Sequence, residues 1–91
     1  MIKVRNIISD SSGKAIANQF IIRDNVRNIT CFQSYDSIIV KRVKGKVYLD
    51  KNKWDYSRTT GKYRNEFIGE TKRATEKRIK SGQYKLVDLN K

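Results

Sequence analysis

The chain has 91 residues with 21 Lys or Arg against 9 Asp or Glu, so its formal net charge is +12. Apolar residues reach 37% in patterned runs, which excludes a disordered chain, and the length is that of one domain over residues 1–91. The sequence holds no apolar run of the roughly 20 residues that a membrane helix needs, no signal peptide, and a single cysteine, Cys31. These features predict a cytoplasmic protein without an intrachain disulfide.

Short strands joined by turns are expected in the first half of the chain. Alternating apolar residues predict strands over residues 2–8, about 14–23 and about 26–34. Asp10–Gly13 supplies the first turn, because Gly permits positive φ and because Asp and Ser bond their own backbone. Ser34–Ser37 is either a tight turn or a bulge.

The strand pattern continues as far as Leu49. Ile38–Val40 is an unbroken apolar triplet, which predicts a strand covered on both faces. Residues 43–47 resemble a hairpin in which Gly45 needs a positive φ, and Val47 and Leu49 belong to its second strand. Strands joined by such short turns indicate an antiparallel, twisted sheet.

After residue 54 the apolar residues recur at helical spacing, and Gly69 can end this short helix in the left-handed conformation. Residues 70–80 predict a second helix, and residues 83–89 predict a last strand that pairs with an earlier one. The fold class is therefore α+β: a small twisted antiparallel sheet of about five to six strands with one or two C-terminal helices packed on it. The large side chains expected in the core are Phe20, Phe32, Trp54 and Phe67.

Catalysis, metal binding and cofactors are not expected. The chain has no His, and Cys31 is expected to be a small buried hydrophobe, so the usual acid–base and thiol arrangements are absent. Zinc sites need clusters of Cys and His. The carboxylates are scattered, and the closest helical pair, Glu66 and Glu70, has Lys62 and Lys72 nearby to neutralise it.

Ser57–Lys62, SRTTGK, is the sharpest candidate for an anion site. Hydroxyls, a Gly and two cations at a helix N-terminus suit a phosphate group, although the spacing is not that of a Walker loop. The alternative is that Thr59 or Thr60 only caps the helix while Arg58 and Lys62 are solvated. Capping is favoured, because it explains those residue types unaided.

Basic residues cluster on either side of this segment, around the hairpin near Gly45 and along the second expected helix. A solvated surface explains any single lysine, whereas the set favours contact with an anionic partner. The aromatic residues between the clusters could stack on unpaired bases. The residues predicted to contact nucleic acid or another anion are Lys41, Arg42, Lys44, Lys46, Arg58, Lys62, Lys72, Arg73 and Lys77.

The segment Val47–Thr71, VYLDKNKWDYSRTTGKYRNEFIGET, together with Ser34–Ser37 carries a recognisable pattern. It resembles a family of small, largely uncharacterised bacteriophage and prophage proteins with a WDYSxTT…FLGE-like motif. The matching residues here are Trp54–Thr60 and Phe67–Glu70, with Ile68 where Leu is usual. The resemblance implies a bacteriophage or prophage protein in the bacterial host cytoplasm, and it brings no catalytic residues.

The charge and the resemblance together predict a non-enzymatic bacteriophage accessory protein that binds nucleic acid through a basic surface. The alternative is an inhibitor or adaptor, such as a counter-defence factor, that docks on an acidic host protein or on a nucleoprotein. A self-associating structural protein is a third possibility. The sequence leaves the oligomeric state open.

Overall fold

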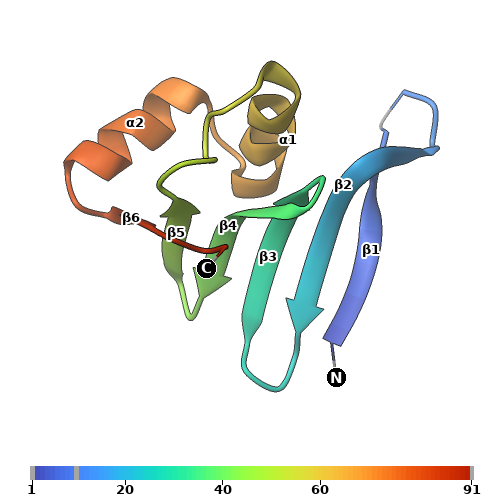
Figure 1. Ribbon diagram of the computed structural model, residues 1–91, viewed down its shortest axis with the longest axis horizontal. Coiled ribbons are helices and arrows are strands. Elements are labelled where there is room, and N and C mark those ends of the chain that lie inside the picture. Colours follow the sequence, from blue (N-terminus) through green and yellow to red (C-terminus); the bar gives the residue numbers. More distant parts are fainter. Residues whose placement is uncertain (1, 10, 91) are drawn as a thin grey trace.

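Six strands form one open sheet, and two helices cover one of its faces (Figure 1). The computed structural model describes residues 2–9 and 11–90, so Asp10 of the first predicted turn lies outside the described residues. None of the helices in this described part is long and apolar enough to cross a membrane. The arrangement is α+β, as predicted. Along the chain the elements are β1 (Ile2–Ile8), β2 (Ala15–Asp24), β3 (Ile29–Ser34), β4 (Ser37–Val43), β5 (Lys46–Asp50), α1 (Arg58–Ile68), α2 (Lys72–Lys80) and β6 (Tyr84–Val87).

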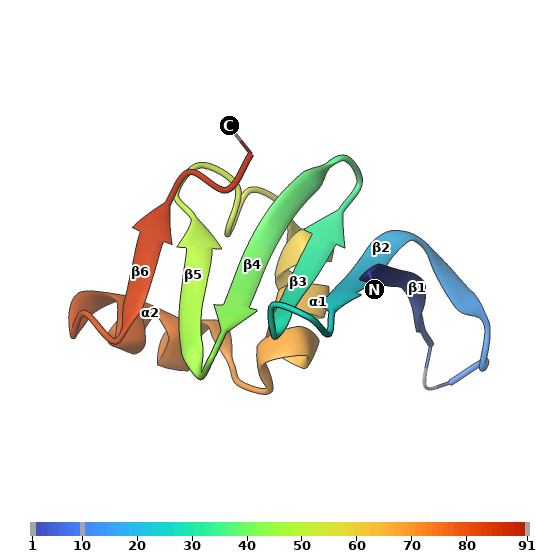
Figure 2. The same ribbon diagram turned by 90° about the horizontal axis from the view of Figure 1, so that it is seen from below.

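The strands lie side by side in the order in which they occur in the sequence, from β1 to β6 (Figure 2). Strands β1 to β5 pair antiparallel, as expected. β6 pairs parallel with β5, so the sheet is mixed rather than wholly antiparallel. The reason is the connection: a crossover that contains α1 and α2 brings the chain back to the end of the sheet at which β5 began.

Two tight turns set the pairing of β4 with its neighbours. Lys44 and Gly45 both have positive φ, 49° and 81°, which is the two-residue turn that fits a twisted hairpin and that favours Gly. Tyr35 has a φ of 57° in the turn between β3 and β4. The Ser34–Ser37 segment is therefore a tight turn, and a separate bulge in the same strand pair leaves Ile39 of β4 without a partner on β3.

Local caps explain where both helices begin and where α1 ends. Ser57 accepts a hydrogen bond from the Thr60 N–H at 3.1 Å, and Thr71 does the same for the Ala74 N–H at 3.2 Å. Gly69 follows α1 with a left-handed φ of 84°, as predicted. These caps satisfy backbone groups that a helix end would otherwise leave unpaired.

The buried core lies between the sheet and the helices. The Phe67 ring of α1 stacks on Phe32 with centroids 5.9 Å apart, and partly buried Trp54 packs on the same cluster. The core positions predicted for these three aromatic residues are confirmed. The fully or almost fully buried apolar residues are Phe32, Ile39, Val40, Leu49 and Tyr84.

Phe20 is the exception among the predicted core aromatics, because it lies on the uncovered face of the sheet. Ile21 pairs in register with Phe32 on the helix side. Its neighbours Phe20 and Ile22 therefore point to the opposite face. The alternation of β2 was readable in the sequence, whereas the covered face is decided by where α1 and α2 dock.

The apolar triplet at the beginning of β4 predicted a strand covered on both faces, and two of its three residues belong to the core cluster while Ile38 lines a groove on the open face. Ile39 and Val40 are fully buried. The Ile38 N–H donates to Asn90 Oδ1 at 2.6 Å, and Asn90 Nδ2 donates to the Ile38 carbonyl oxygen at 2.9 Å. The segment after β6 therefore occupies the backbone groups of β4 beyond the residues that pair with β5.

Candidate nucleic-acid interface

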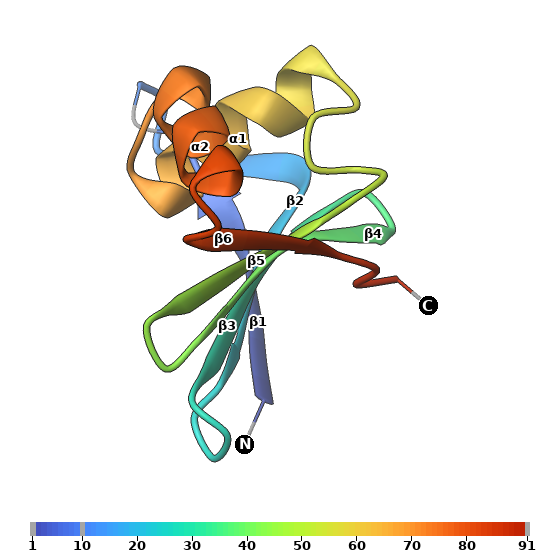
Figure 3. The same ribbon diagram turned by 90° about the vertical axis from the view of Figure 1, so that its left-hand side faces the viewer.

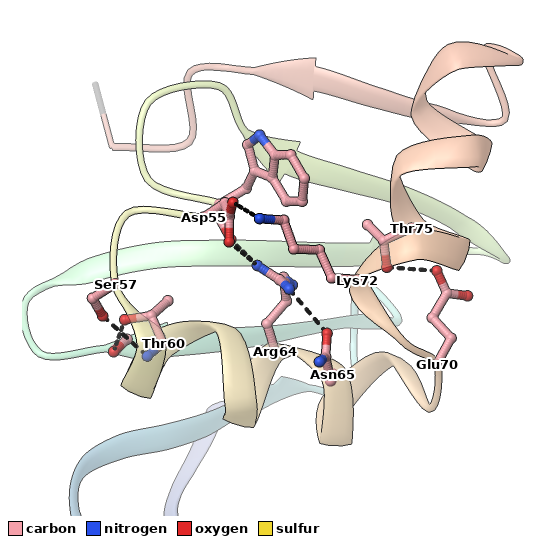
Figure 4. Close-up of polar contacts among 10 residues, drawn as sticks. Asp55, Ser57, Thr60, Arg64, Asn65, Glu70, Lys72 and Thr75 are labelled. Atoms are coloured by element: carbon pink, nitrogen blue, oxygen red, sulfur yellow. Dashed lines mark hydrogen bonds and ion pairs between the residues drawn. The ribbon is translucent and has the colours of Figure 1, made fainter.

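A buried arginine holds together the loop and the helix that carry the WDYSRTT signature (Figure 4). Arg64 of α1 is fully buried. Its Nη1 donates to the Trp54 carbonyl oxygen at 2.6 Å and to Asp55 Oδ1 at 3.2 Å, while Nη2 donates to Asn65 Oδ1 at 2.9 Å. The guanidinium also lies 5.1 Å from the centre of the Trp54 ring. This part of the signature is structural.

Lys72, one of the predicted contact residues, joins the same network from α2. Its Nζ lies 2.6 Å from Asp55 Oδ2 (Figure 4). Partial burial alone would raise the pKa of Asp55, but the hydrogen bonds from Lys72 and Arg64 outweigh it and lower that pKa. The hydrogen bond to Asp55 raises the pKa of Lys72. Lys72 therefore fastens the beginning of α2 to the loop before α1.

The hydroxyl groups of the SRTTGK segment are largely engaged within the protein. Ser57 caps α1, rather than Thr59 or Thr60. Thr60 is fully buried, and its hydroxyl lies 2.9 Å from that of Ser34, which is also fully buried. Helix capping therefore explains Ser57, and a hydrogen bond to Ser34 at the end of β3 explains Thr60. Arg58, Thr59 and Lys62 are exposed.

A second predicted contact residue, Arg42, also makes its contacts inside the fold. Its Nη2 donates to the Phe67 carbonyl oxygen at 3.0 Å, and the guanidinium lies 4.8 Å from the centre of the Phe67 ring. The carbonyl belongs to the last turn of α1, where a cation is favourable. Arg42 therefore holds the end of α1 against the sheet.

The remaining helix-side residues surround a shallow cleft or lie on α2. Arg58, Lys62 and Lys72 line the cleft with Asp55 and half-exposed Tyr56. The carboxylate at its centre is already paired with two cations. Arg73 and Lys77 are exposed on α2.

The other face of the sheet carries a different arrangement, with no helix over it (Figure 3). Lys41, Tyr48 and Lys85 lie opposite one another on β4, β5 and β6, so a partly exposed aromatic ring has a lysine on each side. Lys46 lies further along β5 on the same face, and Lys44 lies in the adjoining turn. We call these five residues the open-face cluster.

A groove of about 510 Å³ runs beside the open-face cluster. Its floor includes Val43 and Val87, and Asp88 is the acidic residue that lines it. Among residues 2–9 and 11–90, the ion pairs involve none of the cluster's lysines. These lysines are therefore available to an external anion.

Sequence reasoning selected three lysines of this cluster as contacts, counted Tyr48 among the aromatic residues that could stack on bases, and missed Lys85. Lys41, Lys44 and Lys46 were expected as contacts, but Lys85 was not. The position of Lys85 beside Tyr48 depends on the parallel pairing of β6 with β5, which no local pattern specifies. Alternation could have separated Lys41 from Arg42, because neighbours on a strand point to opposite faces.

Cys31 also lies on the open face, in register with Lys41. It is half-buried rather than fully buried as expected. Partial burial raises the pKa of its thiol, and the Lys41 ammonium opposes that rise only in part. In the part of the chain that the structure describes, no group of three or more His, Cys, Asp and Glu side chains is placed to hold a metal ion.

The fold and the open-face cluster define a small basic α+β protein with one face of its sheet exposed. A model described as "Family of unknown function (DUF8033)" matches residues 2–83, and the chain belongs to this family. Comparisons with curated proteins and with solved structures found no match. The family description names no source organism, so the resemblance to bacteriophage proteins stays a prediction.

Proposed function

We propose that this protein binds single-stranded nucleic acid on the open face of its sheet. The observation that carries the proposal is the row Lys41–Tyr48–Lys85, in which an aromatic ring on a sheet surface lies between two lysines free of ion pairs. The binding is non-enzymatic. The bacteriophage resemblance adds the setting, an accessory protein acting on nucleic acid in the cytoplasm of a bacterial host.

The chemistry of the row matches the two needs of an unpaired strand. A base stacked on an aromatic side chain contributes about 1–3 kcal/mol and requires no particular sequence. Neighbouring strands of a sheet are about 4.8 Å apart, so an ammonium group on each side of Tyr48 can reach the backbone of a strand whose base lies on the ring. Lys44 and Lys46 extend the positive charge along the hairpin.

The open face is favoured over the helix side because two of the predicted contact residues on the helix side already have partners within the protein. Lys72 is paired with Asp55, and Arg42 is bonded to α1. Arg58, Lys62, Arg73 and Lys77 lie on the helices, across the sheet from the open-face cluster. We therefore assign them a weak, general attraction to nucleic acid rather than the stacking site.

The test is the fluorescence anisotropy of labelled oligonucleotides, with single-stranded DNA, single-stranded RNA and duplex DNA as probes at low salt. Tyr48→Ala is expected to weaken binding to the single strands by roughly 5- to 150-fold, the loss of one stacked base. Each phosphate contact contributes about −0.7 to the slope of log K against log salt. Lys41→Glu combined with Lys46→Glu is expected to make that slope less steep and to abolish most of the affinity.

The matched control reverses two charges on the helices instead, with Lys62→Glu and Lys77→Glu. It changes the net charge by the same amount and is expected to weaken binding far less. An equal loss of affinity in both double variants would mean that nucleic acid responds only to the net charge of the protein and not to a defined site on the open face. No binding to any of the three probes at low salt would overturn the proposal.

A further inference from the structure

The first strand forms an edge of the sheet that no element of the described chain covers. β1 has seven residues and pairs only with β2 on one side. Every second residue of such an edge strand turns its N–H and C=O groups outward, where they can pair with another chain. The strand extends beyond the helices, at the far side of the sheet from α2 (Figure 1).

The two faces of β1 differ in chemistry. Ile2 and Val4 lie on the open face and are 62% and 61% exposed. They continue an apolar surface that runs onto β2 and β3, where Ile22 and Ile29 line a shallow groove of about 370 Å³. A partner strand placed beside β1 would extend this apolar surface with its own side chains.

Positive charge marks the opposite face of the same strand. Lys3 and Arg5 point to the helix side, and Lys3 lies in register with Arg23 on β2. The Arg23 guanidinium is held by the side chains of Thr30 and Asn28, neither of which is acidic. The ion pairs found in residues 2–9 and 11–90 include none of these three cations.

We propose that β1 is a docking edge for an extended acidic segment of a protein partner, which adds to the sheet as a further strand. The segment alternates acidic and apolar residues. Its carboxylates lie beside Lys3 and Arg5, and its apolar side chains lie beside Ile2 and Val4. Backbone hydrogen bonds supply affinity in this mode of binding, and the alternating side chains supply specificity.

The length of the regular edge limits what is recognised. The register of β1 with β2 shifts between Asn6 and Ile8, and the Asn6 side chain donates to the Ile16 carbonyl oxygen at 3.0 Å. A regular ladder is therefore offered by Ile2 to Asn6, enough for a short strand. The occupant needs two acidic residues that are separated by one residue, so that both carboxylates lie on the helix side.

A second copy of the chain fits this edge poorly. Antiparallel self-pairing centred on Val4 would place Lys3 opposite Arg5 of the other copy, and pairing centred on Arg5 would place two arginines together. Like charges directly opposite one another destabilise a sheet. Nucleic acid fits poorly too, because it cannot continue a backbone ladder or cover Ile2 and Val4. An acidic strand with alternating apolar residues can pair with the backbone of β1, neutralise Lys3 and Arg5, and cover Ile2 and Val4.

The test uses a seven-residue blocked peptide of alternating Glu and Val, the length of β1. Binding is measured by the anisotropy of a labelled copy and located by NMR amide shifts. We expect micromolar to millimolar affinity at low salt, with the largest shifts on β1. The same peptide with its outward backbone amides N-methylated is expected to lose at least about tenfold, because methylation removes the ladder hydrogen bonds.

The charge requirement is tested by Lys3→Glu combined with Arg5→Glu. Both side chains are exposed, so the fold is expected to persist, which circular dichroism checks. The variant should bind the Glu/Val peptide at least about tenfold more weakly and gain binding to a Lys/Val peptide of the same length. The matched control, Lys62→Glu with Lys77→Glu, should keep the wild-type preference.

Several outcomes would overturn the docking edge. These are the absence of any binding at millimolar peptide, equal binding of the N-methylated peptide, and unchanged preference in the Lys3/Arg5 variant. Concentration-dependent dimerisation that the Lys3/Arg5 variant alters would identify a second copy as the occupant instead. Oligonucleotide affinity is expected to stay within about threefold in that variant, which separates this site from the open-face cluster.

Discussion

The two faces of the sheet use basic residues for different purposes. On the helix side, buried Arg64 and partly buried Arg42 make short bonds to backbone and side-chain oxygens of the protein itself. On the open side, Lys41, Lys46 and Lys85 surround a tyrosine and make no ion pair within the described residues. A strongly basic composition is therefore partly a property of the fold and only partly a property of the binding surface.

The difference shows what separates structural cations from those that can bind an external anion. Structural cations have hydrogen-bond or ion-pair partners within the protein, and membership of a charge cluster matters less. A buried guanidinium must find acceptors, because an unpaired buried charge is very costly. A lysine on an exposed sheet face keeps its hydration and can exchange it for a phosphate. Substitutions of the two kinds of cation are expected to differ in their effect on stability, with the largest loss on the helix side.

Arg64→Ala is expected to lower the free energy of unfolding by about 3 kcal/mol, because it removes a fully buried side chain and leaves the Trp54 carbonyl without its hydrogen-bond donor, while Asp55 keeps only Lys72 as a partner. Urea denaturation followed by circular dichroism measures the change. Lys77→Ala, an exposed cation on α2, serves as the control and should change stability by less than about 0.5 kcal/mol. Similar losses in both variants would erase the distinction between the two kinds of cation.

Thr60→Val is expected to cost about 1–3 kcal/mol, since the Ser34 hydroxyl then stays buried without its partner. Ser34→Ala should cost a similar amount for the same reason. The double variant should lose less than the sum of the two, because both single changes break one bond. Simple additivity in a double-mutant cycle would show that this bond does not couple β3 to α1.

The stability of the helix side is expected to fall at alkaline pH because of Tyr84. Burial first, and then its hydrogen bond to Glu70, raises the pKa of this phenol. A raised folded-state pKa contributes stability below the unfolded value of about 10, and this contribution disappears as pH rises through the folded value. Thermal unfolding from pH 8 to 11 should show a smaller alkaline loss in Tyr84→Phe than in the wild type.

The smallest effect on stability is expected on the open face. Lys41→Ala and Lys46→Ala should each change the free energy of unfolding by less than about 0.5 kcal/mol, because neither lysine has an ion-pair partner in the described chain. The same variants should weaken oligonucleotide binding measurably. A loss of stability above 1 kcal/mol would make these lysines structural, like Arg64.

Local patterns predicted the elements well, because alternation, turn chemistry and caps depend on neighbours in the sequence. The positive φ of Gly45 and the left-handed end of α1 at Gly69 follow from glycine alone. Arg64 shows where such reasoning ends. It looks like any exposed helical arginine in the sequence, and only the approach of the Trp54–Asp55 loop makes it a fully buried charge.

The sequence by itself determined the α+β class, the hairpin turn at Gly45, the end of α1 at Gly69, the basic charge and the Phe32, Trp54 and Phe67 core positions. The tertiary structure alone decided that β6 joins the sheet in parallel, that Phe20 faces away from the core, and that Lys85 lies beside Tyr48. The physical reason is that contacts between distant segments depend on which sheet face the helices cover. The packing of the whole chain determines which face is covered, and no local segment of the sequence predicts it.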